Sequence, residues 1–446
     1  MPSHGFSFSP DHLSTIAESI LDHARKLGAS ACETDVSEGF GQSVTVRKGE
    51  TDTIEYNRDK GVGVTVYLGQ KRGHASTSDF SQPALEAAVE AALQIARFTA
   101  EDDCAGLAEK ELLATALPDL DLFHPWQPSV QEALELATRC EQAAFDASPA
   151  IRNSEGASVS SQQSHFVTAN SLGFNAGYAT SRHSISCSVI AGEGDQMQRD
   201  DWYDSRRDAA DLDDATDIGT RAARRAEARL GARRVATCEV PVLFEAPLAT
   251  SLLGNFVYAA SGGALYRKSS FLVDSLGQRL FAPHIQIVER PHLLKAFGSA
   301  PFDGDGVATR DRTVVSDGVL AGYFLSCYSA RKLGMQTTAN AGGSHTLQIS
   351  HGERDFEGML AQLGRGLLVT ELLGQGVNYV TGDYSRGAAG FWVEDGRIQY
   401  PVEEITIAGN LREMFAGIVE VGADVWDRGA KHTGSILIDH MKIAGA

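Results

Sequence analysis

Apolar residues recur with two different periods in the first part of the chain, and the two periods follow one another. Residues 13–28 carry apolar side chains at helical spacing and end at Gly28, a pattern typical of an amphipathic helix. The positions on its apolar face are Leu13, Ile16, Ile20, Leu21 and Leu27. Residues 32–73 alternate apolar and polar side chains in short runs, which predicts a meander of about four strands. Pro83 then opens an Ala- and Leu-rich helix over 83–98.

A similar order of periods recurs further along the chain. The pattern predicts a helix over 129–147, strands over 158–169, 173–192 and on to Tyr203, and a second helix over 211–234. We therefore expect two helix–strands–helix units in the first half. Their linker is placed at 109–129, where three prolines, Pro118, Pro125 and Pro128, interrupt any regular pattern.

From Cys238 onward the pattern changes to glycine-rich β-structure. Asp317-Gly318 and Asp395-Gly396 each separate two runs of strand-forming residues, and this dipeptide favours a two-residue hairpin turn. Helices are expected at 247–258 and 355–364. The sequence thus predicts an α+β protein: an N-terminal α/β region of two helix–strands–helix units, followed by a mainly antiparallel β C-terminal domain. The expected domains are 1–115, 116–235 and 236–446.

The helix expected at 211–234 has a polarised charge pattern, with aspartates at its start and arginines at its end. Acidic groups at the positive end of a helix dipole and basic groups at the negative end stabilise the helix by themselves. We interpret the pattern as a solvated helix face rather than as a site for an acidic partner.

The net charge of the chain argues against some classes of binding partner. The 446 residues hold 39 Lys and Arg against 58 Asp and Glu, a formal charge of −19. Such a field repels nucleic acid and anionic membranes, so neither is an expected partner. No apolar run approaches the roughly 20 residues that span a bilayer, and the N-terminus lacks a signal-peptide pattern. Six cysteines lie singly, as in a reducing compartment. These features predict a cytoplasmic protein.

Catalytic motifs are missing from the sequence. No histidine is followed by Glu, as the zinc-peptidase motif HExxH requires, and the helix expected at 247–258 contains no histidine. His345 and His351 are expected on one strand face, but two imidazoles without a third ligand favour structural or surface roles. The acidic glycine-rich run 303–306 is interpreted as a turn rather than a calcium loop. We therefore predict no catalytic and no metal-binding residues in this chain.

The remaining nucleophile candidate is Cys327, because no GxSxG, GxxxxGK[ST] or complete GxGxxG motif occurs. Its apolar neighbours predict a strand and a buried thiol, and buried thiols are usually inert.

Two triplets combine hydroxyl and cationic donors with small neighbours that let another backbone approach. They are Tyr266, Arg267 and Lys268, and Tyr384, Ser385 and Arg386. We predict them as substrate-binding residues that could hold a peptide by strand addition. The alternative is a structural hairpin with surface ion pairs.

Several longer stretches identify a family resemblance. SGGALYRKSSFLVDSLG, RPHLLKAFGSAPFDGDGV, CYSARKLGMQTTANAGG, GLLVTELLGQGVN and TGDYSRGAAGFWVEDGRIQYPVEEITIAGNL resemble the PmbA (TldE) branch of the TldD/PmbA metalloprotease family. The resemblance runs over the whole chain and is most specific from about 260 to 446.

The resemblance implies a two-subunit peptidase that binds extended peptides in an enclosed cavity. The TldD-type partner carries a His-Glu-x-x-x-His motif and a C-terminal Cys as zinc ligands. This chain departs from that pattern in both ligand regions, since the helix expected around 247–260 contains no His and no Cys follows Cys327. It is therefore expected to lack a cofactor of its own, to leave zinc to the TldD-type catalytic subunit, and to complete the substrate cavity.

Two other hypotheses stay open at this point. The chain could itself be a metallopeptidase, acting as a homodimer with an unusual site at His345 or His351. It could also be a module that binds peptides or partner proteins without hydrolysis.

Overall fold

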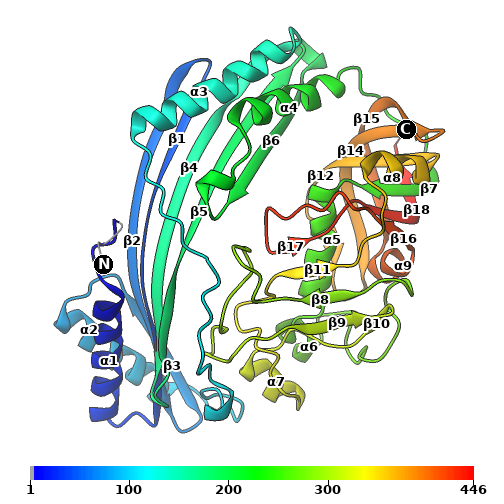
Figure 1. Cartoon of the computed structure of the whole chain (residues 1–446). Helices are drawn as coiled ribbons and strands as arrows, with labels where there is room; N and C mark the ends of the chain where they lie inside the picture. The colour runs from blue at the N-terminus through cyan, green and yellow to red at the C-terminus, as the bar shows by residue number, and fades with distance from the viewer. Residues whose placement is uncertain (1–4, 446) are drawn as a thin grey trace.

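The computed structural model describes residues 5–445 and shows a long curved sheet facing a smaller C-terminal part (Figure 1). The curved sheet has six antiparallel strands in the order β3-β2-β1-β4-β5-β6. These are β1 (Ala31–Arg47), β2 (Glu50–Leu68), β3 (Lys71–Thr77), β4 (Ile151–Asn170), β5 (Asn175–Ala191) and β6 (Gln198–Arg206). Because β1 pairs with β4, both expected helix–strands–helix units contribute to one sheet.

The first unit has two long strands, β1 and β2, and the seven-residue β3 instead of the roughly four short strands that the sequence predicted. Gly39, Gly41 and Gly61 stay inside continuous strands, because each is paired across the sheet. The chain reverses instead at Lys48-Gly49, where both residues have positive φ angles of 56° and 75°. That is the backbone conformation of a two-residue hairpin turn.

Four helices lie on the outer face of this sheet (Figure 1). They are α1 (Pro10–Lys26), α2 (Gln82–Phe98), α3 (Val130–Ala147) and α4 (Ala215–Ala228). The first pair packs on a core that includes Val36, Val64 and Val167, and the second pair on one that includes Val159 and Ile185. Short 3-10 turns occur at Lys110–Leu112, Gly194–Gln196 and Ala209–Asp211. Helix α4 is shorter than the expected 211–234, since Asp214 caps it by accepting a hydrogen bond from the Thr216 backbone N–H.

The C-terminal part contains two further sheets. The larger, seven-stranded sheet has the order β12-β7-β18-β15-β14-β13, with β16 on β18. Its strands are β7 (Cys238–Phe244), β12 (Gly366–Leu373), β13 (Val377–Asn378), β14 (Asp383–Glu394), β15 (Arg397–Asn410), β16 (Ile418–Val421) and β18 (Ile436–Ala444). The smaller sheet has the order β10-β9-β8-β11-β17. Its strands are β8 (Ile287–Glu289), β9 (Arg312–Ser316), β10 (Val319–Leu320), β11 (Leu347–Ile349) and β17 (Lys431–His432).

Five helices accompany these sheets: α5 (Ala246–Ala259), α6 (Gly262–Tyr266), α7 (Cys327–Leu333), α8 (Phe356–Leu363) and α9 (Leu411–Ala416). The expected helices at 247–258 and 355–364 correspond to α5 and α8. Most strand pairs are antiparallel, whereas β7 with β12 and β11 with β17 are parallel. The α+β class is therefore confirmed. None of the helices in residues 5–445 is both long and apolar enough to cross a bilayer.

Both predicted Asp-Gly hairpins are present. Asp317 and Gly318 have φ angles of 49° and 75°, and Asp395 and Gly396 have 51° and 70°. Gly390 precedes the second hairpin, and a Cβ there would lie 1.9 Å from the Leu368 carbonyl oxygen. The glycine thus permits close packing of β14 against β12, and the hairpin is a wall of the C-terminal core.

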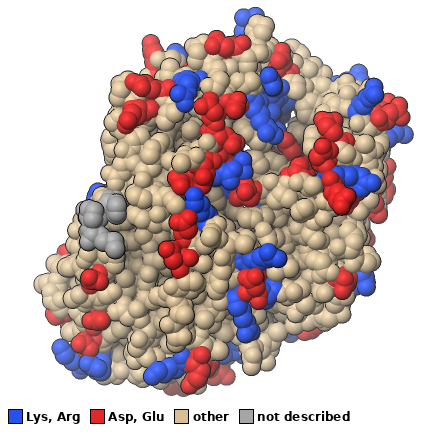
Figure 2. All heavy atoms as spheres, in the orientation of Figure 1, with Lys and Arg blue, Asp and Glu red and all other residues tan. Residues whose placement is uncertain are grey.

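Buried ion pairs join the curved sheet to the C-terminal part. Arg225 on α4 donates to Asp200 on β6 at 3.0 Å and to Glu245, which precedes α5, at 2.7 Å. Arg229 pairs with Asp200 and with Glu371 on β12. The expectation of a solvated helix face is thus wrong for these two arginines. Figure 2 shows acidic and basic side chains interleaved along the seam between the two parts.

Candidate functional site

The first predicted triplet lies at the end of α6. Tyr266 is half-buried, while Arg267 and Lys268 are exposed. Arg267 Nη1 donates to the Tyr266 hydroxyl at 3.0 Å, and its guanidinium carbon lies 5.1 Å from the centre of that ring. Lys268 has a φ angle of 57°, in the left-handed region. The triplet therefore forms a local, solvent-facing turn.

The second triplet lies on β14 and divides between core and surface. Tyr384 is 1% exposed and belongs to the C-terminal core, and burial raises its pKa to about 12. Ser385 is exposed and Arg386 is half-buried. Burial places Tyr384 out of reach of a peptide in this conformation. Peptide binding by the other residues of the two triplets stays a prediction.

The structure brings the segments of the two triplets near one another without a direct contact between them. The backbone N–H of Phe271, just after the first triplet, donates to the Tyr379 carbonyl at 2.8 Å. Tyr379 in turn donates through its hydroxyl to Asn255 on α5 at 2.9 Å.

His345 and His351 do not share a strand face, because β11 covers Leu347–Ile349 and both histidines lie outside it. Nε2 of the buried His345 lies 2.7 Å from the Ala339 carbonyl oxygen. Nδ1 of the exposed His351 lies 2.8 Å from the Gly352 carbonyl oxygen. Each imidazole thus has a backbone partner of its own.

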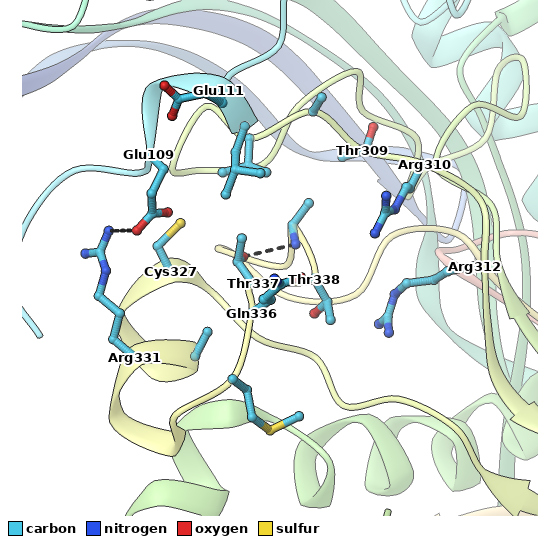
Figure 3. Close-up of a pocket in the computed structure, with 16 residues that line it drawn as sticks. Glu109, Glu111, Thr309, Arg310, Arg312, Cys327, Arg331, Gln336, Thr337 and Thr338 are labelled. Atoms are coloured by element: carbon cyan, nitrogen blue, oxygen red, sulfur yellow. Dashed lines mark hydrogen bonds and ion pairs between the residues drawn. The ribbon is translucent and has the colours of Figure 1, made fainter.

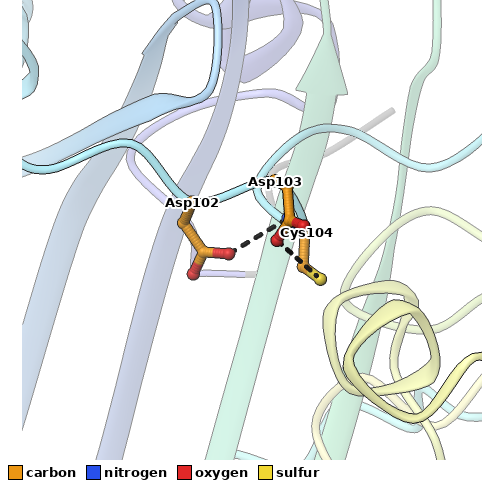
Figure 4. A group of neighbouring side chains, drawn as sticks. All are labelled: Asp102, Asp103 and Cys104. Carbon is orange, nitrogen blue, oxygen red and sulfur yellow. Dashed lines mark hydrogen bonds between the residues drawn. The ribbon is translucent and has the colours of Figure 1, made fainter.

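Among residues 5–445, one group of acidic and thiol side chains has its ligand atoms within 4.8 Å of one another (Figure 4). It consists of Asp102, Asp103 and Cys104. The carboxylate of Asp102 already accepts hydrogen bonds from Lys332 and from the Tyr328 hydroxyl, each at 2.7 Å. These bonds lower the pKa of Asp102 to about 2. Through these bonds Asp102 is engaged in holding α7.

Cys327 is the first residue of α7 rather than part of a strand. Ser326 and Ser329 form a capping box there, which starts a helix where the apolar pattern alone suggested a strand. Burial and the neighbouring Asp305 carboxylate raise the pKa of the Cys327 thiol. A protonated, buried thiol is a poor nucleophile.

The thiol lies on the wall of a cavity of about 660 Å³, which is the size of a ligand pocket (Figure 3). Three segments far apart in the sequence form it: 109–112, 307–312 and 327–339. The first two are joined by hydrogen bonds, because the Ala308 backbone N–H donates to the Leu112 carbonyl and the Ala114 backbone N–H donates to the Gly306 carbonyl, both at 2.9 Å. The cavity thus lies where the linker meets the C-terminal part.

Three arginines line the cavity, and they differ in how fully their guanidinium groups are paired. Both terminal nitrogens of Arg331 are paired, since they donate to the carbonyls of Cys104, Gly106 and Leu107 and to Glu109. Arg331 fastens the linker segment to α7.

Arg312 is held rigidly, and only its Nη1 makes no hydrogen bond with residues 5–445. Its Nε donates to the buried Glu289 at 2.6 Å and its Nη2 to Asn340 at 3.0 Å. Asn340 also donates to Glu289 at 2.9 Å. The guanidinium is therefore fixed in orientation by a carboxylate behind it.

Arg310 makes no side-chain hydrogen bond or ion pair with any residue in 5–445, and it is exposed. Figure 3 shows it beside Arg312, with both guanidinium groups directed into the same space. Sequence reasoning missed this pair. The Arg-x-Arg spacing at an extended segment was the available signal, because alternate residues of such a segment project to the same side.

The comparisons with known proteins agree along the chain. Residues 32–96 match PmbA/TldA metallopeptidase domain 1, residues 123–230 match the central domain and residues 237–445 match the C-terminal domain. Metalloprotease PmbA of Escherichia coli O157:H7 is 49% identical over 417 residues, which cover 94% of this chain and 93% of that protein.

Two solved structures have the same fold. A crystal structure of a candidate modulator of DNA gyrase from Bacteroides thetaiotaomicron has a TM-score of 0.92 at 26% identity, covering 97% of this chain and 98% of that one. TldE from Thermococcus kodakarensis has a TM-score of 0.80 at 20% identity, covering 96% of this chain and 100% of that one. From the matches to all three domains and the 49% identity, we conclude that this chain belongs to the PmbA/TldA metallopeptidase family.

Proposed function

We propose that this chain is the non-catalytic, PmbA/TldE-type subunit of a two-subunit zinc peptidase that cleaves peptides or small unfolded proteins. In this proposal a TldD-type partner carries the zinc and the catalytic residues, and this chain completes the substrate cavity. The resemblance to Metalloprotease PmbA in sequence and to TldE in fold supports it.

The observation that carries the proposal is the chemistry of α5. In the family resemblance, the zinc-binding His-Glu-x-x-x-His motif of the partner belongs to this region. None of the 14 residues of α5 is His, Glu, Asp or Cys. The residues present therefore do not fit zinc, which needs imidazole, thiolate or carboxylate ligands.

The alternative of an independent peptidase would need His345 or His351 as ligands. Their separation by β11 and their backbone partners give that alternative no support. The large cavity, in contrast, gives the chain a means to bind a ligand without performing chemistry itself.

The proposal is tested by measuring zinc content and peptide cleavage in three samples: this chain, a TldD-type partner, and the two mixed. We expect the chain alone to be zinc-free and inactive, and the mixture to bind zinc and cleave. Stoichiometric zinc and cleavage by the chain alone would contradict the proposal. Peptide binding by the chain with no gain in cleavage on mixing would instead support a non-hydrolytic binding module.

The predicted substrate contacts are tested in the same mixture. Arg386→Ala is expected to raise KM with little change in kcat, because a residue that binds the substrate without entering the chemistry contributes uniform binding. Arg397→Ala is the matched control, since Arg397 is an exposed arginine at the hairpin of the same two strands. Equal KM values for the two variants would remove Arg386 from the substrate-binding set.

A further inference from the structure

The cavity between 109–112, 307–312 and 327–339 has a polar side and an apolar side. Arg310 and Arg312 lie on the polar side (Figure 3). The apolar lining comes from Leu112, Val307, Cys327, Ala330, Met335 and Ala339. A ligand that fills it must combine an anionic group with an apolar body.

The charges around the cavity specify how much negative charge the ligand carries. Arg331 is neutralised by Glu109, and Arg312 is neutralised by Glu289. Arg310 is left without a counterion among the described residues. The exposed Glu111 also lines the cavity, so the lining is close to neutral overall and the attraction for an anion comes from Arg310 alone. One unpaired cation matches a monoanion such as a carboxylate better than a phosphate dianion.

The two guanidinium groups also have the geometry for a carboxylate. Arg312 is oriented by Glu289 and Asn340, and its remaining donor group is Nη1. Arg310 directs its free donors into the same space (Figure 3). Guanidinium groups recognise carboxylates through paired charge-assisted hydrogen bonds, which are stronger than neutral ones.

We propose that this cavity captures the C-terminal carboxylate of a peptide whose last side chain is apolar. The carboxylate lies between Arg310 and Arg312, and the last side chain packs on the apolar lining. The inference rests on the proposed function for the nature of the substrate, and it names the end of the peptide that this subunit holds. Capture of one chain end would position the peptide for a partner's catalytic centre.

The experiment measures binding to this chain alone by fluorescence anisotropy. The probe is an N-terminally labelled pentapeptide that ends in Leu with a free carboxylate, and its comparison is the same peptide with a C-terminal amide. Because charge-assisted hydrogen bonds are at stake, we expect the amide to bind about tenfold or more weakly. Inorganic phosphate is added as a competitor.

Arg310→Ala is expected to abolish the preference for the free acid, and Arg310→Lys to retain part of it. Arg224→Ala is the matched control, because Arg224 is another exposed arginine and lies on α4, away from α7 and this cavity (Figure 1). It should leave the preference unchanged.

Equal binding of acid and amide to the unmodified chain would overturn the inference, as would an unchanged preference in Arg310→Ala. Displacement of the peptide by phosphate at lower concentration than by the unlabelled free-acid peptide would also overturn it. Since the partner is absent from this assay, its outcome is independent of the cleavage test. Cleavage by the mixture without acid preference would leave the proposed function standing and this inference refuted.

Discussion

Arginines in two regions of this molecule, α4 and the cavity, have opposite environments. Arg225 and Arg229 on α4 have side chains 18% and 11% exposed, and each pairs with two carboxylates. Arg310, at the cavity, is exposed and has no counterion among residues 5–445. Arg225 and Arg229 stabilise the contact between the curved sheet and the C-terminal part, whereas Arg310 is available to a ligand. The number of partners, rather than the residue type, distinguishes the arginines that stabilise the fold from the one that we propose to bind a ligand.

The largest effect is expected for Arg225→Ala. This change leaves Asp200 and Glu245 buried and deprives them of their shared cation. Removing one member of a buried ion pair destabilises a protein by about 3 to 5 kcal/mol. Although burial lowers the pKa of Arg225, the charges of Glu245 and Asp200 outweigh that effect and raise it, so the arginine is charged at every accessible pH. Urea unfolding gives the free energy.

Arg224→Ala, one position earlier on the same helix, is the control for that measurement. Arg224 is exposed, so its removal should change the free energy of unfolding by less than about 0.5 kcal/mol. Similar losses for the two variants would show that the ion pairs do not carry the stability of the junction.

A smaller effect is expected for Glu289→Gln behind the cavity. Glu289 accepts hydrogen bonds from Arg312, Asn340 and the His345 backbone N–H. The amide keeps one acceptor but places a donor against another donor, which costs about 1 to 3 kcal/mol of unfolding free energy. Release of Arg312 should also weaken the preference for the free-acid peptide. A stable variant that retains this preference would show that Arg312 is not oriented by Glu289.

Local signals in the sequence predicted much of the fold. The helix that became α1, the Pro83 helix start and both Asp-Gly turns are all determined by neighbouring residues. Strand length was not predictable in this way, because Gly39 and Gly61 are stabilised within β1 and β2 by partners across the sheet. Cys327 is a different case, because the capping box of Ser326 and Ser329 that starts α7 is a local signal, and the apolar pattern alone did not include it.

The candidate site was less predictable, because its walls come from three distant segments. Nothing local to Arg310 or Arg312 indicates that the linker at 109–112 closes over them. Tyr384 illustrates the opposite error: a hydroxyl next to Ser385 and Arg386 looked accessible, but strand alternation turns it into the core. Contacts of long range, and the side of a strand that is covered, are properties of the tertiary fold.

Glu33 on β1 is a carboxylate without an ion pair among residues 5–445. It accepts a hydrogen bond from the Tyr67 hydroxyl at 2.9 Å, and burial, with the Asp305 charge, raises its pKa to about 7. An unfolded chain releases this proton near pH ~4.3. The contribution of Glu33 to the free energy of unfolding is therefore fully present below that pH and is lost as the pH rises to about 7. Above about pH 7 this contribution no longer changes.

Unfolding free energies at pH 5 and pH 8 measure this loss. Glu33→Gln should reduce the difference between the two pH values, because glutamine does not titrate. Glu50→Gln, at an exposed position of the adjacent strand, is the control and should leave the difference as it is in the unmodified chain. An unchanged difference in Glu33→Gln would assign the pH dependence to other groups.

The smallest effect is expected for the stability of Arg310→Ala, and it is the sharpest test of the contrast between the two regions. The native structure shows no hydrogen bond or ion pair of the Arg310 side chain within residues 5–445, so truncation should change the free energy of unfolding by less than about 0.5 kcal/mol. The same urea titration that reports on Arg225→Ala measures it. A loss above about 1 kcal/mol would mean that Arg310 is already paired in the folded chain, and a guanidinium that is already paired is not free to bind a carboxylate.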